Sequence, residues 1–302
     1  MKKILNLLII SCLFLLVGCG AATTITTKES TTIEPTTILP TTTEEPTTTY
    51  PFSLLNYDGY SLVWSDEFDG TSLNLDYWNY QLGNGAEYGI SGWGNNEKQI
   101  YNEASTTVSG GTLKISATKN GDVINSSRLT TKDKKGFTYG IIEAKIKLPE
   151  GQGFWPAFWM LPSTTKYGNW PLSGEIDIME AKGRVLTSTS SAIHFGKGTV
   201  HMYYSEEQTF KNNAKISDFH TYSLLWTSEG MYFYVDCDLY YEILSWNDRF
   251  NQYTMPAPFD EDFYIILNLA VGGNFDQGLV PLDDDYPGVM EVDYVRVYQT
   301  EA

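Results

Sequence analysis

Cysteine is scarce in this sequence, and its distribution excludes a disulfide-stabilised fold. Of the three cysteines in 302 residues, Cys12 and Cys19 lie within the first twenty. The rest of the chain holds only Cys237 and cannot form a disulfide framework. No histidine lies near Cys237 in the sequence, whereas a reactive cysteine usually has a basic neighbour. We therefore expect a structural role for Cys237.

Positive charge is also in short supply. The chain has 20 Lys and Arg residues against 37 Asp and Glu, which gives a formal net charge of -17. Such a surface repels polyanions through its long-range field, and this argues against nucleic acid or anionic lipid as a partner. Sulfated and uronic glycans are disfavoured for the same reason, whereas a neutral polysaccharide is not.

The N-terminus has the layout of an export signal. Lys2 and Lys3 precede an apolar run over residues 4–17, which is short for a membrane span and typical of a secretory signal. The run ends in Leu-Val-Gly-Cys at 16–19, which resembles the lipobox of bacterial lipoproteins and predicts lipidation of Cys19. An ordinary cleaved signal is the alternative. Both place the protein outside the cytoplasm, and lipidation would make it a cell-surface lipoprotein that contacts membrane only through this anchor.

Residues 20–50 are rich in Thr, with Pro and Glu interspersed and few side chains able to form a core. Such a composition stays extended and solvated. We predict a disordered linker that holds the folded part away from the cell surface.

Residues 51–302 lack helical periodicity and instead show short segments rich in Val, Ile and aromatic residues, separated by Gly, Asn, Asp and Pro. This pattern predicts an all-β domain, and its length suits one β-sandwich. The alternation in 141–148 further predicts a strand with one solvated face. The clearest predicted strands are 112–117, 140–148, 219–226, 231–235, 263–270 and 290–298.

Three acids lie within one apolar segment, Gly-Glu-Ile-Asp-Ile-Met-Glu at 174–180. On a helix Glu175 and Asp177 would point about 200° apart, whereas on a strand they share one face. A regular strand would send Glu180 to the opposite face. One extra residue near Ile178 and Met179, a β-bulge, would return Glu180 to the face of the other two acids.

With this bulge the carboxyl groups of Glu175 and Glu180 should lie about 5 or 6 Å apart. Retaining glycosidases hold their two carboxyl groups about 5 to 5.5 Å apart, and inverting ones about 6.5 to 9.5 Å. The spacing predicts a retaining pair, with Asp177 as an assistant that raises the proton affinity of a glutamate. A solvated acidic strand face and a calcium site are the alternatives.

The Glu-x-Asp-x-x-Glu strand resembles the signature of glycoside hydrolase family 16, and the resemblance extends over residues 63–298. It implies a jelly-roll, concanavalin-like β-sandwich with a concave substrate cleft, with Glu175 as nucleophile and Glu180 as general acid/base. Segments 92–97 and 267–274 are most similar to the laminarinases, which are endo-acting on β-1,3-glucan. Further matching segments are 64–68, 155–159, 218–220 and 292–296.

Aromatic and polar residues complete the expected site. Trp155 and Trp159 are four apart and share a strand face, a spacing suited to stacking on successive sugar rings; by resemblance both line the cleft. The resemblance also implies substrate-binding roles for a further set, of which His194 would lie on the strand next to the acids: Trp93, Asn95, Asn96, Arg128 and His194.

Many relatives carry a structural calcium ion, and the resemblance implies one here. Its ligands would be backbone carbonyls of Glu67 and Gly111 and the carboxylate of Asp293, although Asp293 could equally be an ordinary acid at a strand end. The chemistry itself requires no cofactor or metal.

The expected function is retaining endo-hydrolysis of β-1,3-glucan of the laminarin type, by a monomer. Two departures from the family leave the linkage open, because Phe275 stands where the family has tryptophan and 182–208 has no close match. The alternatives are a mixed-linkage β-1,3-1,4-glucanase, a galactan hydrolase or a transglycosylase of the same family, or a non-catalytic surface lectin that binds glucan.

Overall fold

The computed structural model describes residues 54–247 and 251–301. The predicted signal peptide, the lipid site at Cys19 and the linker lie outside these ranges and stay predictions. Within the described ranges, no helix has both the length and the apolar character needed to cross a membrane.

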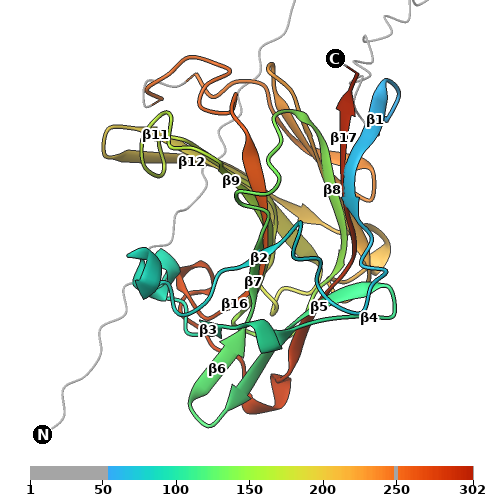
Figure 1. Ribbon diagram of the computed structural model, residues 1–302, viewed down its shortest axis with the longest axis vertical. Helices are drawn as coiled ribbons and strands as arrows, with labels where there is room; N and C mark the ends of the chain where they lie inside the picture. Colours follow the sequence, from blue (N-terminus) through green and yellow to red (C-terminus); the bar gives the residue numbers. More distant parts are fainter. Residues whose placement is uncertain (1–53, 248–250, 302) are drawn as a thin grey trace, which may run out of the picture. The chain divides into compact units, whose positions relative to one another are not determined.

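Two sheets, antiparallel except where β3 meets β6, pack face to face (Figure 1). The first has seven strands, in the order β12 (Val200–Thr209), β11 (Ser188–Lys197), β10 (Glu175–Glu180), β9 (Phe154–Pro162), β16 (Phe263–Val271), β7 (Arg128–Thr130) and β2 (Asn79–Tyr80). In Figure 1 this sheet lies on the left of the sandwich.

The second sheet has ten strands. Its order is β15 (Asp238–Ile243), β14 (Met231–Val235), β13 (His220–Trp226), β8 (Gly140–Lys147), β17 (Gly288–Thr300), β5 (Thr112–Asn120), β6 (Val123–Ser126) and β3 (Ile100–Tyr101), with β1 (Tyr60–Asp66) paired to β17 and β4 (Thr106–Ser109) paired to β5.

The helical elements described are short 3₁₀ turns in the connections, which fits the absence of helical periodicity. They are η1 (Ala86–Tyr88), η2 (Ser91–Gly94), η3 (Glu103–Ser105), η4 (Lys211–Asn213), η5 (Asn274–Asp276) and η6 (Asp283–Asp285).

The core fills the space between the sheets. Each strand sends alternate side chains inward, so that Phe158 and Leu267 from one sheet meet Ile142 and Val297 from the other, all fully buried. Burial of one such side chain contributes about 1.5–3 kcal/mol. All six strands predicted from the sequence are present, and the predicted all-β jelly-roll sandwich is confirmed.

The predicted solvated face of 141–148 is wrong for the first half of the segment. Ile141 and Glu143 are 0% and 2% exposed, because a second apolar cluster covers this outer face. Leu55 and Tyr57, which precede β1, contribute to that cluster, and the Tyr57 hydroxyl donates to Glu143 Oε2 at 2.5 Å. Local alternation identified the two faces of β8 but could not reveal the distant segment that packs on one of them.

Cys237 lies in the tight turn between β14 and β15, where Asp236 and Cys237 have φ values of 52° and 68°. Its side chain packs against the second apolar cluster, and burial raises the pKa of its thiol. A raised pKa disfavours the reactive thiolate, in agreement with the structural role expected for this residue.

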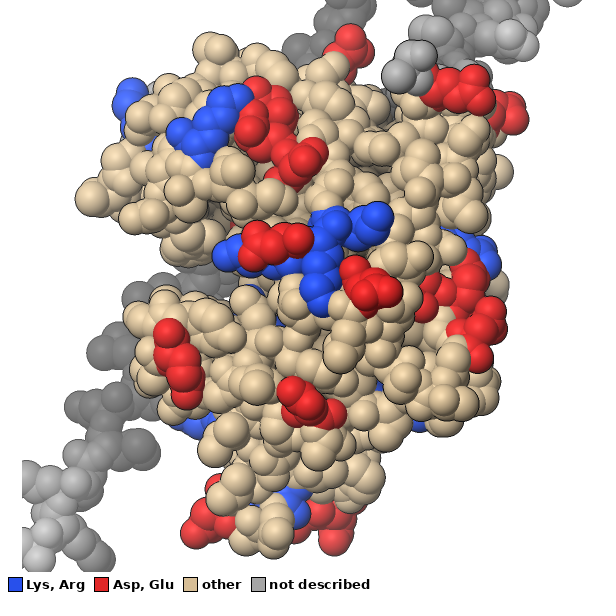
Figure 2. All heavy atoms as spheres, viewed as in Figure 1, with Lys and Arg blue, Asp and Glu red and all other residues tan. Residues whose placement is uncertain are grey.

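Figure 2 shows that Asp and Glu side chains form several separate groups on one face of the molecule. The largest group of Lys and Arg side chains on this face lies next to acidic ones, and the face carries no broad basic patch. Such a face offers no track for a polyanion.

Candidate active site

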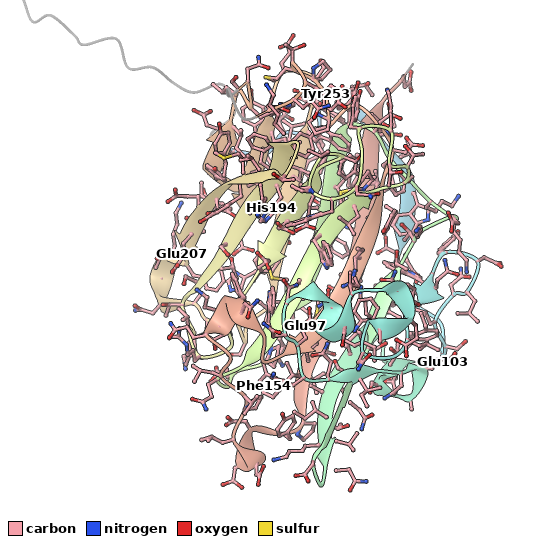
Figure 3. The ribbon with its side chains drawn as sticks, turned by 90° about the vertical axis from the view of Figure 1, so that its left-hand side faces the viewer. Glu97, Glu103, Phe154, His194, Glu207 and Tyr253 are labelled. Carbon is pink, nitrogen blue, oxygen red and sulfur yellow. The ribbon has the colours of Figure 1, made fainter. Side chains whose placement is uncertain are left out.

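A cleft of about 760 Å³ lies over the seven-stranded sheet. Alternate residues of β9, β10 and β16 form its floor, since every second side chain of a strand points to the same side. Figure 3 looks onto this sheet. The residues predicted from the sequence that line the cleft are Trp93, Asn95, Arg128, Trp155, Trp159, Glu175, Asp177 and Glu180.

The predicted bulge in β10 is present. The register of β10 shifts against β11 between Asp177 and Glu180, and against β9 between Asp177 and Met179. As a result Ile178 and Met179 are both buried in the core, and the next side chain, Glu180, returns to the cleft beside Glu175. The carboxyl spacing of 5 or 6 Å stays a prediction.

Glu175 and Glu180 each accept a hydrogen bond from an indole. Trp170 Nε1 donates to Glu175 Oε2 at 3.0 Å, and Trp155 Nε1 donates to Glu180 Oε1 at 2.8 Å. Both bonds leave the second carboxyl oxygen of each glutamate available to a substrate. The indoles therefore orient the two acids without occupying them.

His194 lies on β11 directly opposite Glu175 in the strand register, on the neighbouring strand as predicted. Its Nε2 is 3.0 Å from Asp177 Oδ2 and 3.8 Å from Glu175 Oε1. In Figure 3 His194 lies near the middle of the sheet. It is not among the residues that line the cleft, so it acts on the acids from beside them.

Burial dominates the electrostatics of the three acids. It raises the pKa of Glu175, Asp177 and Glu180 to about 8 each, and the charge of Asp177 adds to the rise for both glutamates. The charge of His194 opposes the rise in the pKa of Glu175. Because the groups interact, they titrate together as one cluster.

These raised pKa values predict how stability depends on pH. The folded state binds more protons than the unfolded state between about pH 4.5 and 8, so stability is fully present below this window and is lost as pH rises through it. We expect the stability of Asp177→Asn to decrease less than that of wild type as pH rises through this window. One pKa unit corresponds to about 1.4 kcal/mol, or roughly 3–5 °C in Tm for a domain of this size.

The measurement is the Tm of wild type and variant at pH 5.5 and pH 8.5. Asp122→Asn, which removes an exposed charge from the β5–β6 turn, is the matched control and should keep the wild-type slope. Equal slopes for Asp177→Asn and wild type would show that Asp177 takes no part in the proton uptake.

Aromatic side chains form the walls of the cleft. Trp155 stacks on Phe275, with ring centroids 5.0 Å apart and planes 22° apart. Arg128 lies between two indoles, with its guanidinium carbon 4.5 Å from the Trp93 ring and 4.7 Å from the Trp159 ring. Flat faces of this kind suit the apolar faces of pyranose rings.

The turn around η2 forms one end of the cleft. Gly92 and Trp93 have φ values of 62° and 52°, a left-handed conformation that glycine adopts without strain. The turn places Trp93 and Asn95 on the cleft. Asn96 does not line it; its side chain is exposed and donates from Nδ2 to Asn274 Oδ1 at 2.9 Å.

Among the cleft residues that were not identified from the sequence, Glu97, Trp170 and Asn268 make hydrogen bonds that shape the site. Glu97 accepts hydrogen bonds from Gln99 at 2.6 Å and Tyr101 at 3.1 Å, and burial raises its pKa. Asn268 Oδ1 accepts from Trp159 Nε1 at 2.6 Å. A signal was available for Glu97 and Asn268, which lie in segments 92–97 and 267–274 of the family resemblance, whereas Trp170 lies outside every segment that carries it.

The predicted calcium ligands lie near one place in the second sheet. Asp66 pairs with Val295 and Leu113 with Val292, so the backbone after β1 and before β5 reaches β17 near Asp293. The Asp293 carboxylate is 2.7 Å from Lys145 Nζ, which already supplies a positive charge there. The strand register fits the predicted carbonyl donors, and the ion itself stays a prediction.

The fold and site together define a class of protein. Two partly exposed carboxylic acids on one strand face, inside an aromatic-walled cleft on a β-sandwich, are the equipment of an enzyme that cleaves glycosidic bonds in polysaccharides. The sequence matches the family "Glycosyl hydrolases family 16" over residues 93–294. The chain belongs to this family.

Similar proteins agree with this assignment. "Glucan endo-1,3-beta-glucosidase A1" of Niallia circulans is 41% identical over 268 residues, covering 80% of this chain and 38% of that protein. "Glucan endo-1,3-beta-glucosidase" of Cryptopygus antarcticus is 38% identical over 269 residues, covering 81% of this chain and 94% of that protein. Relatives in Rhizobium meliloti at 28% and 30% identity are named endo-1,3-1,4-beta-glycanases.

The fold is likewise similar to solved structures. The laminarinase from Flavobacterium sp. UMI-01 superimposes with a TM-score of 0.70 at 38% sequence identity, and the match covers 79% of this chain and 100% of that chain.

Proposed function

We propose that this glycoside hydrolase cleaves β-1,3-glucan internally and with retention of configuration. The observation that carries the proposal is the bulged strand β10, which places Glu175 and Glu180 on one face of the cleft, each oriented by an indole. Relatives named as endo-1,3-β-glucosidases at 41% and 38% identity support the linkage.

In the proposed reaction Glu180, kept protonated by burial, gives its proton to the glycosidic oxygen as the bond from that oxygen to C1 breaks. The Glu175 carboxylate attacks C1 from the opposite side and forms a glycosyl ester. Glu180 then takes a proton from water, which attacks C1 and releases Glu175. Two inversions at C1 give net retention.

His194 and Asp177 adjust the charge of the nucleophile. A protonated His194, 3.8 Å from Glu175 Oε1, favours the ionised form of Glu175 that attacks C1. Asp177, which is 4% exposed, has the opposite effect on both glutamates and keeps Glu180 protonated. The pair thus supports one ionised and one protonated glutamate in the same cleft.

Mixed-linkage glucan is the second candidate substrate. Phe275, which replaces the tryptophan of the family, stacks directly on Trp155 beside the acid/base Glu180, where a change in the aromatic wall alters contacts with the sugar on that side of the bond. Relatives named as 1,3-1,4-β-glycanases belong to the same comparison.

The test is hydrolysis of laminarin, mixed-linkage glucan and agarose by residues 51–302, followed through reducing ends and product sizes. We expect short oligosaccharides to appear early from laminarin, with the β-anomer as the first product in proton NMR. An α-anomer as first product would contradict retention, and binding without cleavage of all three polymers would favour a lectin.

We also propose that the enzyme is exported and held at the cell surface by a lipid on Cys19. This rests on the residues of the N-terminal segment alone, which combine an apolar run with a terminal Leu-Val-Gly-Cys. A Thr-rich linker would then let the cleft reach polymer at a distance from the membrane.

A further inference from the structure

A second histidine lies beside His194. The hairpin of β11 and β12 pairs Gly196 with His201 and His194 with Tyr203, which makes His194 and His201 diagonal neighbours on one face of the sheet. His194 Nδ1 is 2.8 Å from His201 Nε2, and the ring centroids are 5.0 Å apart. Nothing in the expected chemistry of the cleft uses His201.

The contact restricts where protons can sit. A nitrogen–nitrogen distance of 2.8 Å requires one hydrogen between the two rings, because two N–H groups would face each other if both rings were doubly protonated there. The other nitrogen of His194, Nε2, lies 3.0 Å from Asp177 Oδ2, a buried oxygen that has no hydrogen-bond partner among the described residues. A neutral His194 can direct a proton from Nε2 at this oxygen only if its Nδ1 accepts one, and His201 is the group placed to donate it.

His201 also contacts Trp170, which like His194 lies next to the nucleophile Glu175. Its ring lies 4.7 Å from the ring of Trp170, whose indole donates to Glu175 Oε2. Gly196, opposite His201, leaves room for this contact: a Cβ there would come within 3.2 Å of Pro171 Cγ and 2.2 Å of Val200 O. The hairpin is thus shaped to hold the 170–171 segment over His201.

We propose that His201 is a positioning residue for the reaction. It holds His194 in the tautomer that keeps a proton on Nε2, directed at Asp177 and Glu175, and it supports Trp170 against Glu175. This inference rests on the proposed hydrolysis, because its consequence for rate is the ionisation of the nucleophile Glu175.

The groups around the histidine pair favour one proton shared between the two rings. Glu175 and Asp177 from β10 face His194, and Tyr203 from β12 lies beside both rings. Burial and the neighbouring charge of His194 lower the pKa of His201. A neutral His201 can accept the Nδ1 proton of a charged His194 or donate to a neutral one, so it serves either state.

Two variants distinguish the hydrogen-bonding role of the His201 nitrogen from the packing role of its aromatic ring. His201→Phe keeps an aromatic ring against Trp170 but offers no partner to His194 Nδ1, whereas the amide of His201→Gln can still donate to it or accept from it. We expect His201→Phe to lower kcat about tenfold. It should also move the acid limb of kcat/KM to higher pH by about half a unit or more. The reason is that less positive charge then remains near Glu175 to favour its ionised form. His201→Gln should restore most of both.

Imidazole NMR gives a readout that does not depend on activity. The chain has three histidines, and the third, His220, meets Asp236 at Nδ1 and the Lys215 carbonyl at Nε2, so it serves as an internal control. In ¹⁵N-histidine-labelled wild type we expect His194 to carry its proton on Nε2 across neutral pH. In His201→Phe the His194 signals should no longer show a single tautomer with the proton on Nε2, while those of His220 stay unchanged.

An unprotonated Nε2 on His194 in wild type, or a His201→Phe enzyme with the wild-type pH profile and His194 signal, would overturn the proposal. So would a His201→Gln enzyme as impaired as His201→Phe at equal Tm. Failure of the proposed function is visible separately, as a wild type inactive on every glucan, and the imidazole signals then still decide whether His201 sets the tautomer.

Discussion

Glu175→Gln is expected to reduce hydrolysis of laminarin by about four orders of magnitude or more, because an amide oxygen cannot form the glycosyl ester on which both steps depend. The change keeps the size of the side chain and its acceptor for Trp170 Nε1, which now lies 3.0 Å from Oε2. Glucan binding should therefore remain measurable by calorimetry.

Glu103→Gln is the matched control, since Glu103 is exposed and is not among the residues that line the cleft. Figure 3 labels Glu103 near the right-hand side of the molecule, apart from His194. It makes the same chemical change and should leave kcat unaltered. Residual activity of Glu175→Gln above about one percent of wild type, in protein free of wild-type contamination, would assign the nucleophile to another group.

The position of the acids could be predicted from the sequence because their chemistry leaves little choice. Charged residues alternating with Ile176 and Ile178 are compatible with a strand that has one apolar face. Only a bulge places Glu180 on the same face as Glu175. The two register shifts in β10 confirm this reasoning, which needed no knowledge of any other segment.

Such reasoning from local sequence could not predict contacts between distant segments. The cover over Glu143 comes from Tyr57, 86 residues earlier in the chain. The partner of His194 comes from a stretch without a close match in the family, and the diagonal position of His201 depends on the register of the β11–β12 hairpin. Sequence spacing alone does not determine such a register, since it is set by the turn that joins the strands.

Asn96 illustrates a different limit. The resemblance implied a sugar contact for it along with Asn95, yet the two neighbours face different surroundings, since Asn95 lines the cleft and Asn96 bonds to Asn274. The turn at η2 has irregular φ and ψ values, so the side-chain directions of successive residues follow no simple period there. A motif locates such a turn but not the direction of each of its side chains.

Glu180→Ala is expected to lower the rate on substrates with a poor leaving group far more than on those with a good one. On laminarin, whose leaving sugar needs a proton, the rate should fall about 10²–10⁴-fold. On a laminari-oligosaccharide with a 2,4-dinitrophenyl leaving group, the first step needs no acid and should be nearly as fast as in wild type. The glycosyl ester on Glu175 then accumulates, because no base activates water, and a burst of dinitrophenol should precede slow turnover.

Azide provides the deciding measurement for this variant. A small anion can enter the space left by the Glu180 side chain and attack the ester without a base, so added azide should accelerate turnover and give a β-glycosyl azide. Glu103→Gln should show neither burst nor azide effect. Equal losses on both substrates would remove Glu180 from the acid/base role. An α-glycosyl azide would mean that azide had attacked the substrate directly, which is the outcome expected when Glu175, and not Glu180, is missing.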